Sequence, residues 1–320
     1  MKVLVAGASG VVGRQLLPQL IAAGHEVTGL ARSADDVGGV EMMAVDALDQ
    51  KAVRAAVERA EPEALVHVAT AIPAQIDPRR IDKDFAMTNR LRTEGTAYLL
   101  DAARRAGISR IVTQGLGYAY DPNGSEPADE SVPLWRNPPR KFAPVLTALR
   151  QMESAVEEAG GAVLRFGHLY GPGSSYAADG SFIRQVRARQ VPIVGGGTAT
   201  FSFIHSQDAA AAVVAALETS ASGVFNVVDD VPTKMGEWLP ILAAGLGAPA
   251  PRKVPTFLAR AAVGGWGVAF MTQLRGADNT RAKRILRWQP QIPSWRLGFD
   301  LELDLELDVR NSQISKESLS

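Results

Sequence analysis

The first residues of the chain constrain its fold more than any other segment. The apolar run "KVLVAGA" leads directly into the glycine-rich "GASGVVG" at 7–13, and a helical pattern continues through Leu20. Glycines allow a sharp turn, close approach of backbone N–H groups to a phosphate and tight helix packing, and the helix N-terminus faces the negative charge. The strand–turn–helix context therefore predicts a dinucleotide-binding loop. The residues expected around the pyrophosphate are Gly7, Ser9, Gly10, Val11, Val12 and Gly13.

The end of the next predicted strand, "HEVTGLAR", indicates which dinucleotide binds. A site for NAD usually has an acidic residue there, which accepts hydrogen bonds from the ribose. This strand instead ends at Ala31, and Arg32 and Ser33 follow. A cation and a hydroxyl suit a 2′-phosphate, so we expect NADP(H) as the cofactor. Asp46 and Ala47, after the third predicted strand, are expected near the adenine, although Asp46 could instead cap the next helix.

Apolar strands alternate with helices through the first half of the chain. The other strands are expected at 40–46, 64–70, 110–116 and 162–170, and the later helices at 52–60, 87–107 and 142–156. Continuous apolar strands separated by helices predict an α/β fold, a Rossmann-type doubly wound parallel sheet covered on both faces.

The second half has a different texture, with glycine- and proline-rich loops between short helices. We expect a Rossmann domain over 1–170, to which 199–228 returns, and a smaller, mostly helical substrate domain over 171–198 and 229–300, with a lid at 255–275 that carries Trp266 and Phe270. Residues 301–320 form a tail. Its "LELDLELDV" alternates apolar and acidic residues, which suits an edge strand, or a loosely docked terminus.

Composition excludes several classes of partner and site. Lys and Arg together number 34, as do Asp and Glu, so neither a nucleic acid nor an anionic membrane is an expected partner. The chain has no cysteine, and its four histidines lack metal-ligand spacing, so no metal site is expected. Without a recognisable secretory signal or membrane-spanning stretch, the expected location is the cytoplasm. Nothing indicates an oligomeric state.

Several further segments resemble a known family by their order along the chain. After the glycine loop come "LVHVAT", "LRFGHLYGPG", "FSFIHSQDAAAAVVAALE", "GVFNVVDD" and "AKRILRWQPQIPSW". Together, over residues 1–298, they resemble the extended short-chain dehydrogenase/reductases, the epimerase/dehydratase group. The resemblance implies an active site between a Rossmann domain and a small substrate domain. It also implies that Ala69 and Thr70 line the cofactor's ribose side and that the nicotinamide is bordered by Phe166, Gly167 and His168.

The same resemblance reveals a departure at the catalytic positions. The family works with a Ser or Thr after the fifth strand and with a Tyr-x-x-x-Lys helix. When Glu153 is matched to the family's usual Glu, Val145 takes the Tyr position and Leu149 the Lys position. Matching Tyr120 to the family's usual Tyr puts Leu116 in the hydroxyl position. The chain thus resembles an atypical subgroup without the triad, which includes reductases of aromatic polyketide biosynthesis such as angucyclinone ketoreductases.

Three hypotheses remain for a chain without these side chains. In the first, which we take as the expectation, an NADPH-dependent ketoreductase acts on a polycyclic aromatic ketone whose own phenol supplies the proton, because an intramolecular proton has a large effective molarity. In the second, an epimerase/dehydratase-like enzyme uses a relocated acid, His168, whose imidazole titrates in a useful range, or a tyrosine. In the third, the chain is a non-catalytic NADP-binding redox sensor or partner-docking protein.

The substrate side is expected to combine apolar and polar residues. Asn89 and Arg92 share one face of the helix at 87–107, where they could hold a water molecule or a substrate oxygen, or be ordinary surface residues. Arg150, next to the Lys position, would point about 100° around its helix. The full set of expected substrate contacts is Leu116, Gly117, Tyr118, Tyr120, Val145, Leu149, His168, Asn89 and Arg92.

Overall fold

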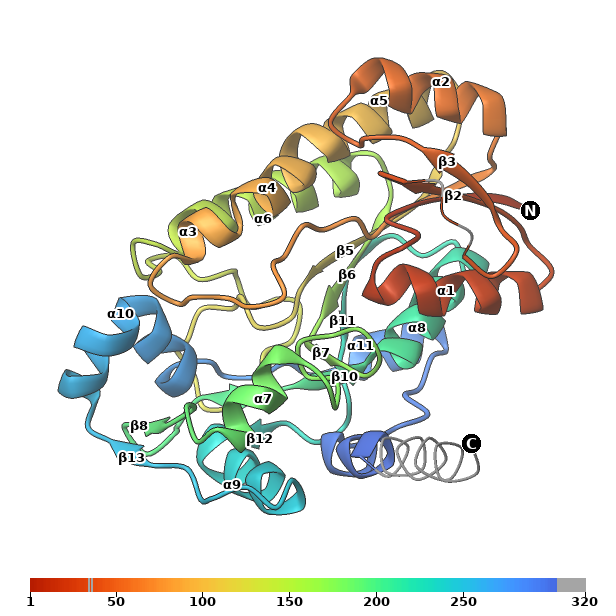
Figure 1. The fold of residues 1–320 in the computed structure, drawn as a ribbon. Helices are drawn as coiled ribbons and strands as arrows, with labels where there is room; N and C mark the ends of the chain where they lie inside the picture. The colour runs from red at the N-terminus through yellow and green to blue at the C-terminus, as the bar shows by residue number, and fades with distance from the viewer. Residues whose placement is uncertain (34, 36, 304–320) are drawn as a thin grey trace, which may run out of the picture.

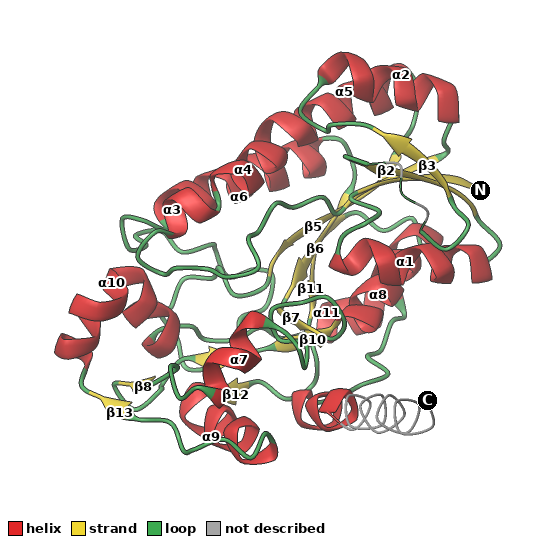
Figure 2. Cartoon of the chain, viewed as in Figure 1, coloured by secondary structure: helices red, strands yellow, loops and turns green. Residues whose placement is uncertain are grey.

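A seven-stranded parallel sheet forms the centre of the protein (Figures 1 and 2). The structure, a computed structural model, describes residues 1–33, 35 and 37–303. The strand order is β11-β6-β5-β4-β1-β2-β3. The strands are β1 (Lys2–Ala6), β2 (Glu26–Ala31), β3 (Glu41–Ala44), β4 (Ala64–His67), β5 (Arg110–Leu116), β6 (Ala162–Phe166) and β11 (Gly223–Val227). The predicted doubly wound α/β fold is confirmed, and the strand order reverses between β1 and β4, where such sheets bind their ligands.

Helices cover both faces of this sheet (Figure 1). One face carries α1 (Val11–Ala22), α8 (Ser206–Glu218) and α11 (Thr280–Leu286), and the other carries α2 (Gln50–Ala60), α5 (Thr96–Arg105) and α6 (Ala143–Glu158). Alternate residues of β1 show the division, because Val3 and Val5 belong to one hydrophobic core and Leu4 and Ala6 to the other. The continuous apolar strands therefore follow from burial on both faces.

The helix expected at 87–107 is interrupted. It consists of α4 (Ala86–Arg90), a π-helical turn η1 (Leu91–Gly95) and α5, and the short α3 (Ile81–Asp84) precedes it. The strand expected at 162–170 is also divided, because β6 ends at Phe166 and β7 (His168–Tyr170) pairs instead with β10 (Phe203–His205). The break lies at Gly167, where a Cβ atom would lie 2.4 Å from the carbonyl oxygen of Ser202.

Smaller elements lie beyond the carboxyl ends of the central strands (Figure 1). They are α7 (Ser181–Arg187), α9 (Met235–Gly245), α10 (Thr256–Thr272), β8 (Ile193–Val194), β9 (Thr200–Phe201), β12 (Thr233–Lys234) and β13 (Lys253–Val254). Helix α10 is broken at Gly264, whose φ is 71° and ψ −178°. Its second half packs onto the start of α6, where the rings of Trp266 and Phe142 stack with centroids 3.6 Å apart.

Of the two alternatives for the tail, the edge strand is wrong for residues 301–303. Residues 295–303 are helical, and residues 304–320, which include the rest of that segment, lie outside the described residues. None of the helices in the described part of the chain has the length and apolar character needed to cross a bilayer.

Candidate functional site

The glycine loop at residues 7–13 packs closely against the chain that follows β4 and leads into α1. Gly7 has a φ of +93°, and a Cβ atom on it would lie 2.5 Å from the backbone nitrogen of Ala69. A Cβ atom on Gly13 would lie 2.3 Å from the carbonyl oxygen of Gly7, so neither position admits a side chain. Ser9 and Gly10 are exposed at the N-terminus of α1, whose first turn has no acidic residue. This loop fits a pyrophosphate.

The region after β2 combines a cation with a carboxylate. Arg32 and Ser33 are exposed, and the Ser33 hydroxyl donates a 2.7 Å hydrogen bond to Asp35, a residue that sequence reasoning did not consider. A guanidinium suits a 2′-phosphate, whereas a carboxylate suits a free ribose hydroxyl. Asp46 is exposed and accepts from the backbone N–H of Leu48, and the residue that caps α2 is Asp49. The capping alternative for Asp46 is therefore excluded.

The expected nicotinamide border lies where β6 ends. Phe166 and His168 are buried on either side of the break at Gly167. The Phe166 carbonyl accepts a 2.7 Å hydrogen bond from the N–H of Gly117, which joins the loop after β5 to this border. On the ribose side, Ala69 lies against Gly7 and Thr70 is exposed. The residues that the resemblance predicts around the cofactor thus all lie at the carboxyl ends of the parallel strands.

The three aliphatic residues at the catalytic positions are buried in the hydrophobic core. Val145 and Leu149 have no exposed surface, and Leu116 is 7% exposed. They belong to the hydrophobic core that also contains Phe142 and Trp266. Packing therefore keeps these three expected substrate contacts out of reach of a ligand in this structure, and their side chains have no group that could give or take a proton.

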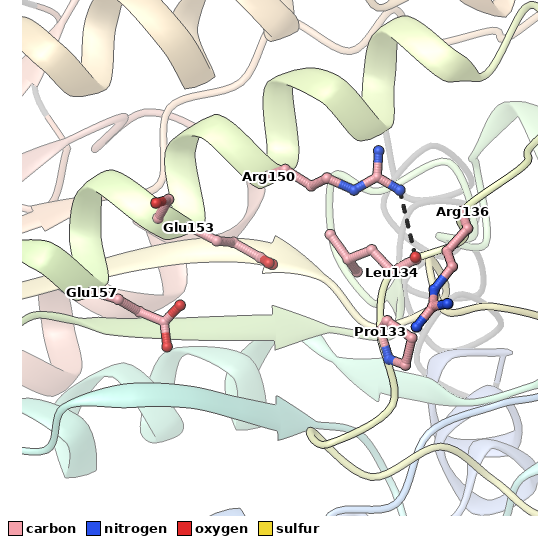
Figure 3. A pocket seen from close by; sticks show the side chains of 7 residues that line it. Pro133, Leu134, Arg136, Arg150, Glu153 and Glu157 are labelled. Carbon is pink, nitrogen blue, oxygen red and sulfur yellow. Dashed lines mark hydrogen bonds between the residues drawn. The ribbon is translucent and has the colours of Figure 1, made fainter.

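The Arg150 side chain points toward Leu134 and Arg136, as Figure 3 shows. Its Nη2 atom donates to the carbonyl oxygens of Trp135, at 2.6 Å, and Leu134, at 3.4 Å. It lines an open hollow of about 520 Å³ on the outer side of α6, together with Arg136 and Glu157. Arg150 therefore cannot replace the missing lysine.

Glu153, which also lines this hollow, forms a buried bidentate ion pair with Arg165 of β6. The two hydrogen bonds measure 2.8 and 2.7 Å, and each side chain is 7% exposed. Burial alone would lower the pKa of Arg165, but its hydrogen bonds to the Glu153 carboxylate raise it above its usual range. The pair holds α6 on the sheet.

His168 has its tautomer fixed by a backbone carbonyl. Its Nδ1 atom lies 3.2 Å from the oxygen of Ser202, which can only accept, so Nδ1 carries the hydrogen and Nε2 keeps a lone pair. Nε2 has no partner among the described residues. Burial lowers the pKa of His168 to about 3, so the ring is neutral at physiological pH. It has no proton at Nε2 to donate, which opposes the role of relocated acid.

The two tyrosines after β5 lie in different surroundings. Tyr120 donates a 2.6 Å hydrogen bond to the Asn226 side chain, and it packs in a separate small cluster with Ala128 and Ala277. Burial raises the pKa of Tyr120 to about 12. The Tyr120 hydroxyl is thus used in a structural hydrogen bond to Asn226, whereas the sequence analysis expected it to contact the substrate. Tyr118 instead stacks on His168 with ring centroids 4.5 Å apart, and Phe270 of α10 meets it edge-on at 6.3 Å.

Asn89 and Arg92 face the protein interior. Arg92, in η1, is 3% exposed, and burial lowers its pKa to about 10, so the guanidinium stays charged. Its Nη1 and the Oδ1 atom of Asn89 have no hydrogen-bond partner within the described chain. The surface-residue alternative for Arg92 is therefore wrong.

Sequence reasoning missed other members of this site. His67 has a buried Nδ1 atom that no described residue satisfies, and Phe201 stacks on the second face of His168 at 4.3 Å. The only sequence signal for Phe201 was its position in an aromatic strand. Across the described residues, no cluster of His, Asp and Glu could hold a metal ion.

The chain is similar to known proteins over most of its length. Residues 3–228 match the NAD dependent epimerase/dehydratase family. A Streptomyces 3-diazoavenalumate denitrifying reductase is 44% identical over 94% of this chain and 100% of its own length. A Stigmatella aurantiaca 4-hydroxy-2-methyl-3-oxo-4-farnesyl-3,4-dihydroquinoline-1-oxide ketoreductase is 29% identical over 82% of this chain and 78% of its own.

Among solved structures, the UDP-glucose 4-epimerase of Thermotoga maritima has the same fold, with a TM-score of 0.77 at 21% identity over 97% of this chain and 99% of that one. The family and its reductase relatives support an oxidoreductase with a nicotinamide cofactor. The chain belongs to the NAD dependent epimerase/dehydratase family.

Proposed function

We propose that this protein is an NADPH-dependent reductase of an aromatic diazo compound, a substrate whose reduction needs no proton from the protein. The observation that carries the proposal is the absence of a proton donor at the expected positions. Val145, Leu149 and Leu116 are aliphatic and buried, and His168 has no hydrogen at Nε2. The relative named as a denitrifying reductase of a diazo compound supports the substrate class.

The chemistry of such a substrate matches the residues present. When bound, the reduced nicotinamide supplies a hydride, and addition of hydride to an arenediazonium ion with loss of N₂ yields the arene without protonation. The chain's own residues bind and orient: the glycine loop takes the pyrophosphate, and Arg32 takes the 2′-phosphate that favours NADPH. Tyr118 and Phe270 offer aromatic surfaces that would hold a flat ring and exclude water.

A second candidate is the reduction of a polycyclic aromatic ketone whose neighbouring phenol supplies the proton. The unpaired Nε2 of His168 favours it, because this atom would accept a hydrogen bond from a substrate hydroxyl and so orient it. The ketoreductase relative supports the same class of reaction. The buried, acid-free catalytic positions suit both candidates.

One assay separates these candidates. The purified protein is given NADPH with an ortho-hydroxyarenediazonium salt, with a polycyclic aromatic ketone that carries a neighbouring phenol, or with the methyl ether of that ketone. The diazo proposal predicts N₂ release equal to NADPH consumed, and a Gly13→Val variant, which cannot form the glycine loop, serves as the control for reaction in solution. Turnover of the phenolic ketone alone would replace the proposal with the second candidate. Tight NADPH binding without any turnover would instead support the redox sensor.

A further inference from the structure

Arg92 is a buried cation that forms no ion pair with any carboxylate among the described residues. Its side chain is almost inaccessible, and Nη1 donates to no described residue. Burial lowers the pKa of Arg92 and the charge of Glu153 opposes this shift in part, but the Glu153 carboxylate is itself paired with Arg165 at 2.7 Å. Glu94, two residues along the chain, pairs with Arg90 at 2.8 Å. A buried charge that lacks a partner strongly destabilises the folded protein, so the retention of Arg92 indicates that an anion pairs with it in the working complex.

The backbone around Arg92 explains how it comes to face inward. The π-helical turn η1 widens the helix, and such turns are frequent at functional sites. The Leu91 carbonyl in this turn is met by the Nε2 atom of His67 at 3.3 Å and by the Thr96 hydroxyl at 3.4 Å. η1 packs against α6, the helix in which Leu149 takes the Lys position. Figure 1 shows α4 and α6 running side by side.

The guanidinium lies within electrostatic reach of the ring pair that lines the site. Arg92 and Tyr118 lie close enough for the guanidinium to oppose, in part, the rise that burial causes in the pKa of Tyr118, and the Tyr118 ring stacks on His168. Three other buried polar atoms here lack partners: Oδ1 of Asn89, Nδ1 of His67 and Nε2 of His168. Of the four residues, only Arg92 carries a charge, since burial lowers the pKa values of His67 and His168 to about 4 and about 3.

We propose that Arg92 is an oxyanion-binding residue, whose guanidinium stabilises the negative charge left on a substrate oxygen when hydride arrives. Charge stabilisation by a cation from the neighbouring helix thereby takes the place of proton donation from α6. The inference rests on the proposed function and specifies its substrate class, an aromatic compound with an ionisable oxygen conjugated to the centre that accepts the hydride.

The electron balance shows where the charge appears. An ortho-diazo phenolate is neutral overall; hydride adds to the ring carbon, N₂ leaves with the carbon–nitrogen electron pair, and the phenolate oxygen keeps an uncompensated negative charge. In a ketone, the carbonyl π pair moves onto oxygen and gives an alkoxide. Loss of one oxyanion donor typically lowers kcat by about 10²–10³-fold, which sets the size of the expected effect.

Three variants test the rate. Arg92→Met removes the charge at similar volume, Arg92→Lys keeps a charge without the planar fork, and Arg90→Met on the same helix is the matched surface control. We expect single-turnover reduction to fall about 10²–10³-fold in Arg92→Met and less in Arg92→Lys, with no change in Arg90→Met or in NADPH affinity. Wild-type rates in a folded Arg92→Met variant that binds NADPH would overturn the proposal.

A binding experiment separates this inference from the proposed reaction. The NADP complexes are titrated with 4-nitrophenol, and the ionisation of the bound phenol is followed by its absorbance. A neighbouring cation lowers the pKa of a phenol, so the bound probe should ionise at lower pH in the wild type than in Arg92→Met. If the wild type reduces no substrate but shows this difference, the proposed function fails and the anion site stands. Equal ionisation in both proteins, or no binding of the probe, contradicts the anion site whatever the reaction.

Discussion

The backbone carbonyl of Ser202 fixes which nitrogen of His168 carries the proton, across a distance of 3.2 Å. Because burial also lowers the pKa of His168 to about 3, this ring does not change its charge over the range in which histidines usually act. The pH dependence of a reaction at this site must therefore come from the substrate or from another group.

The first prediction follows from this geometry. In His168→Phe, the ring contacts with Tyr118 and Phe201 are kept and the nitrogens are lost, so we expect kcat to change less than about tenfold and KM to rise. In the wild type, kcat should show no histidine-like step between about pH 5 and 8. A drop of about 10²–10⁴-fold in kcat, the usual effect of losing a general acid, would restore His168 as the proton donor.

The second prediction concerns the choice of dinucleotide. Arg32→Ala should weaken NADPH binding about tenfold and leave NADH binding unchanged, because the guanidinium would contact only the 2′-phosphate. Asp35→Ala, next to Ser33, should act in the opposite direction by removing a carboxylate from the same region. Dissociation constants for both cofactors, measured by fluorescence titration, check these changes. Equal weakening of NADPH and NADH by Arg32→Ala would assign Arg32 a structural role.

The third prediction tests the ion pair beneath α6. Glu153→Gln leaves the Arg165 guanidinium buried without its counter-ion, which typically costs about 3–5 kcal/mol. Glu157→Gln, on the exposed side of the same helix, should have almost no effect. Urea unfolding monitored by circular dichroism gives both values. If Glu153→Gln proved no less stable than Glu157→Gln, the pair would not hold the helix on the sheet.

The fourth prediction concerns pH and stability. Burial raises the pKa of Asp229 to about 8, well above the value near 4 of an unfolded Asp. Above about pH 4 the unfolded chain loses this proton while the folded chain keeps it, so this group's contribution to stability falls by about 1.4 kcal/mol per pH unit until about pH 8. Asp229→Asn does not titrate, so its stability relative to the wild type should increase from pH 5 to pH 8.

The matched control for this experiment is Asp230→Asn, which removes a partly exposed carboxylate that pairs with Lys283 at 2.6 Å. Melting temperatures of the wild type, Asp229→Asn and Asp230→Asn, measured at pH 5 and pH 8, test this prediction. A difference between Asp229→Asn and the wild type that stays constant with pH would show that Asp229 is ionised in the folded protein.

The parts of the molecule that sequence reasoning predicted are those set by local backbone chemistry. The glycine loop requires Gly7 and Gly13 because side chains there would collide with backbone, and this requirement is visible in the sequence. The sheet follows from apolar strands alternating with helices. The placement of Val145 and Leu149 at the catalytic positions came only from the family resemblance. For Arg92 the sequence left a surface position and a position at the site equally open, and burial decides between them.

The sequence predictions failed where contacts between distant parts of the chain determine the local structure. The break after β6 falls at Gly167, where Ser202, between β9 and β10, leaves no room for a side chain. The tail prediction relied on alternation from Leu301 and ignored Trp295 and Phe299, which are spaced by four residues, are buried, and carry the helix that continues to residue 303. A π-helical turn such as η1 uses the same residues as an α-helix, so the pattern at 87–107 could not reveal it.

The break at Gly264 has a consequence for how a substrate enters. It divides α10 into a first half, whose Phe257 is 74% exposed, and a second half, whose Trp266 and Phe270 cover α6 and Tyr118. Because the backbone at Gly264 is not helical, the covering half can swing without first melting a turn. We therefore expect that the site opens only when Trp266 separates from Phe142 and Phe270 separates from Tyr118, so that the strength of these ring contacts controls access to the cofactor.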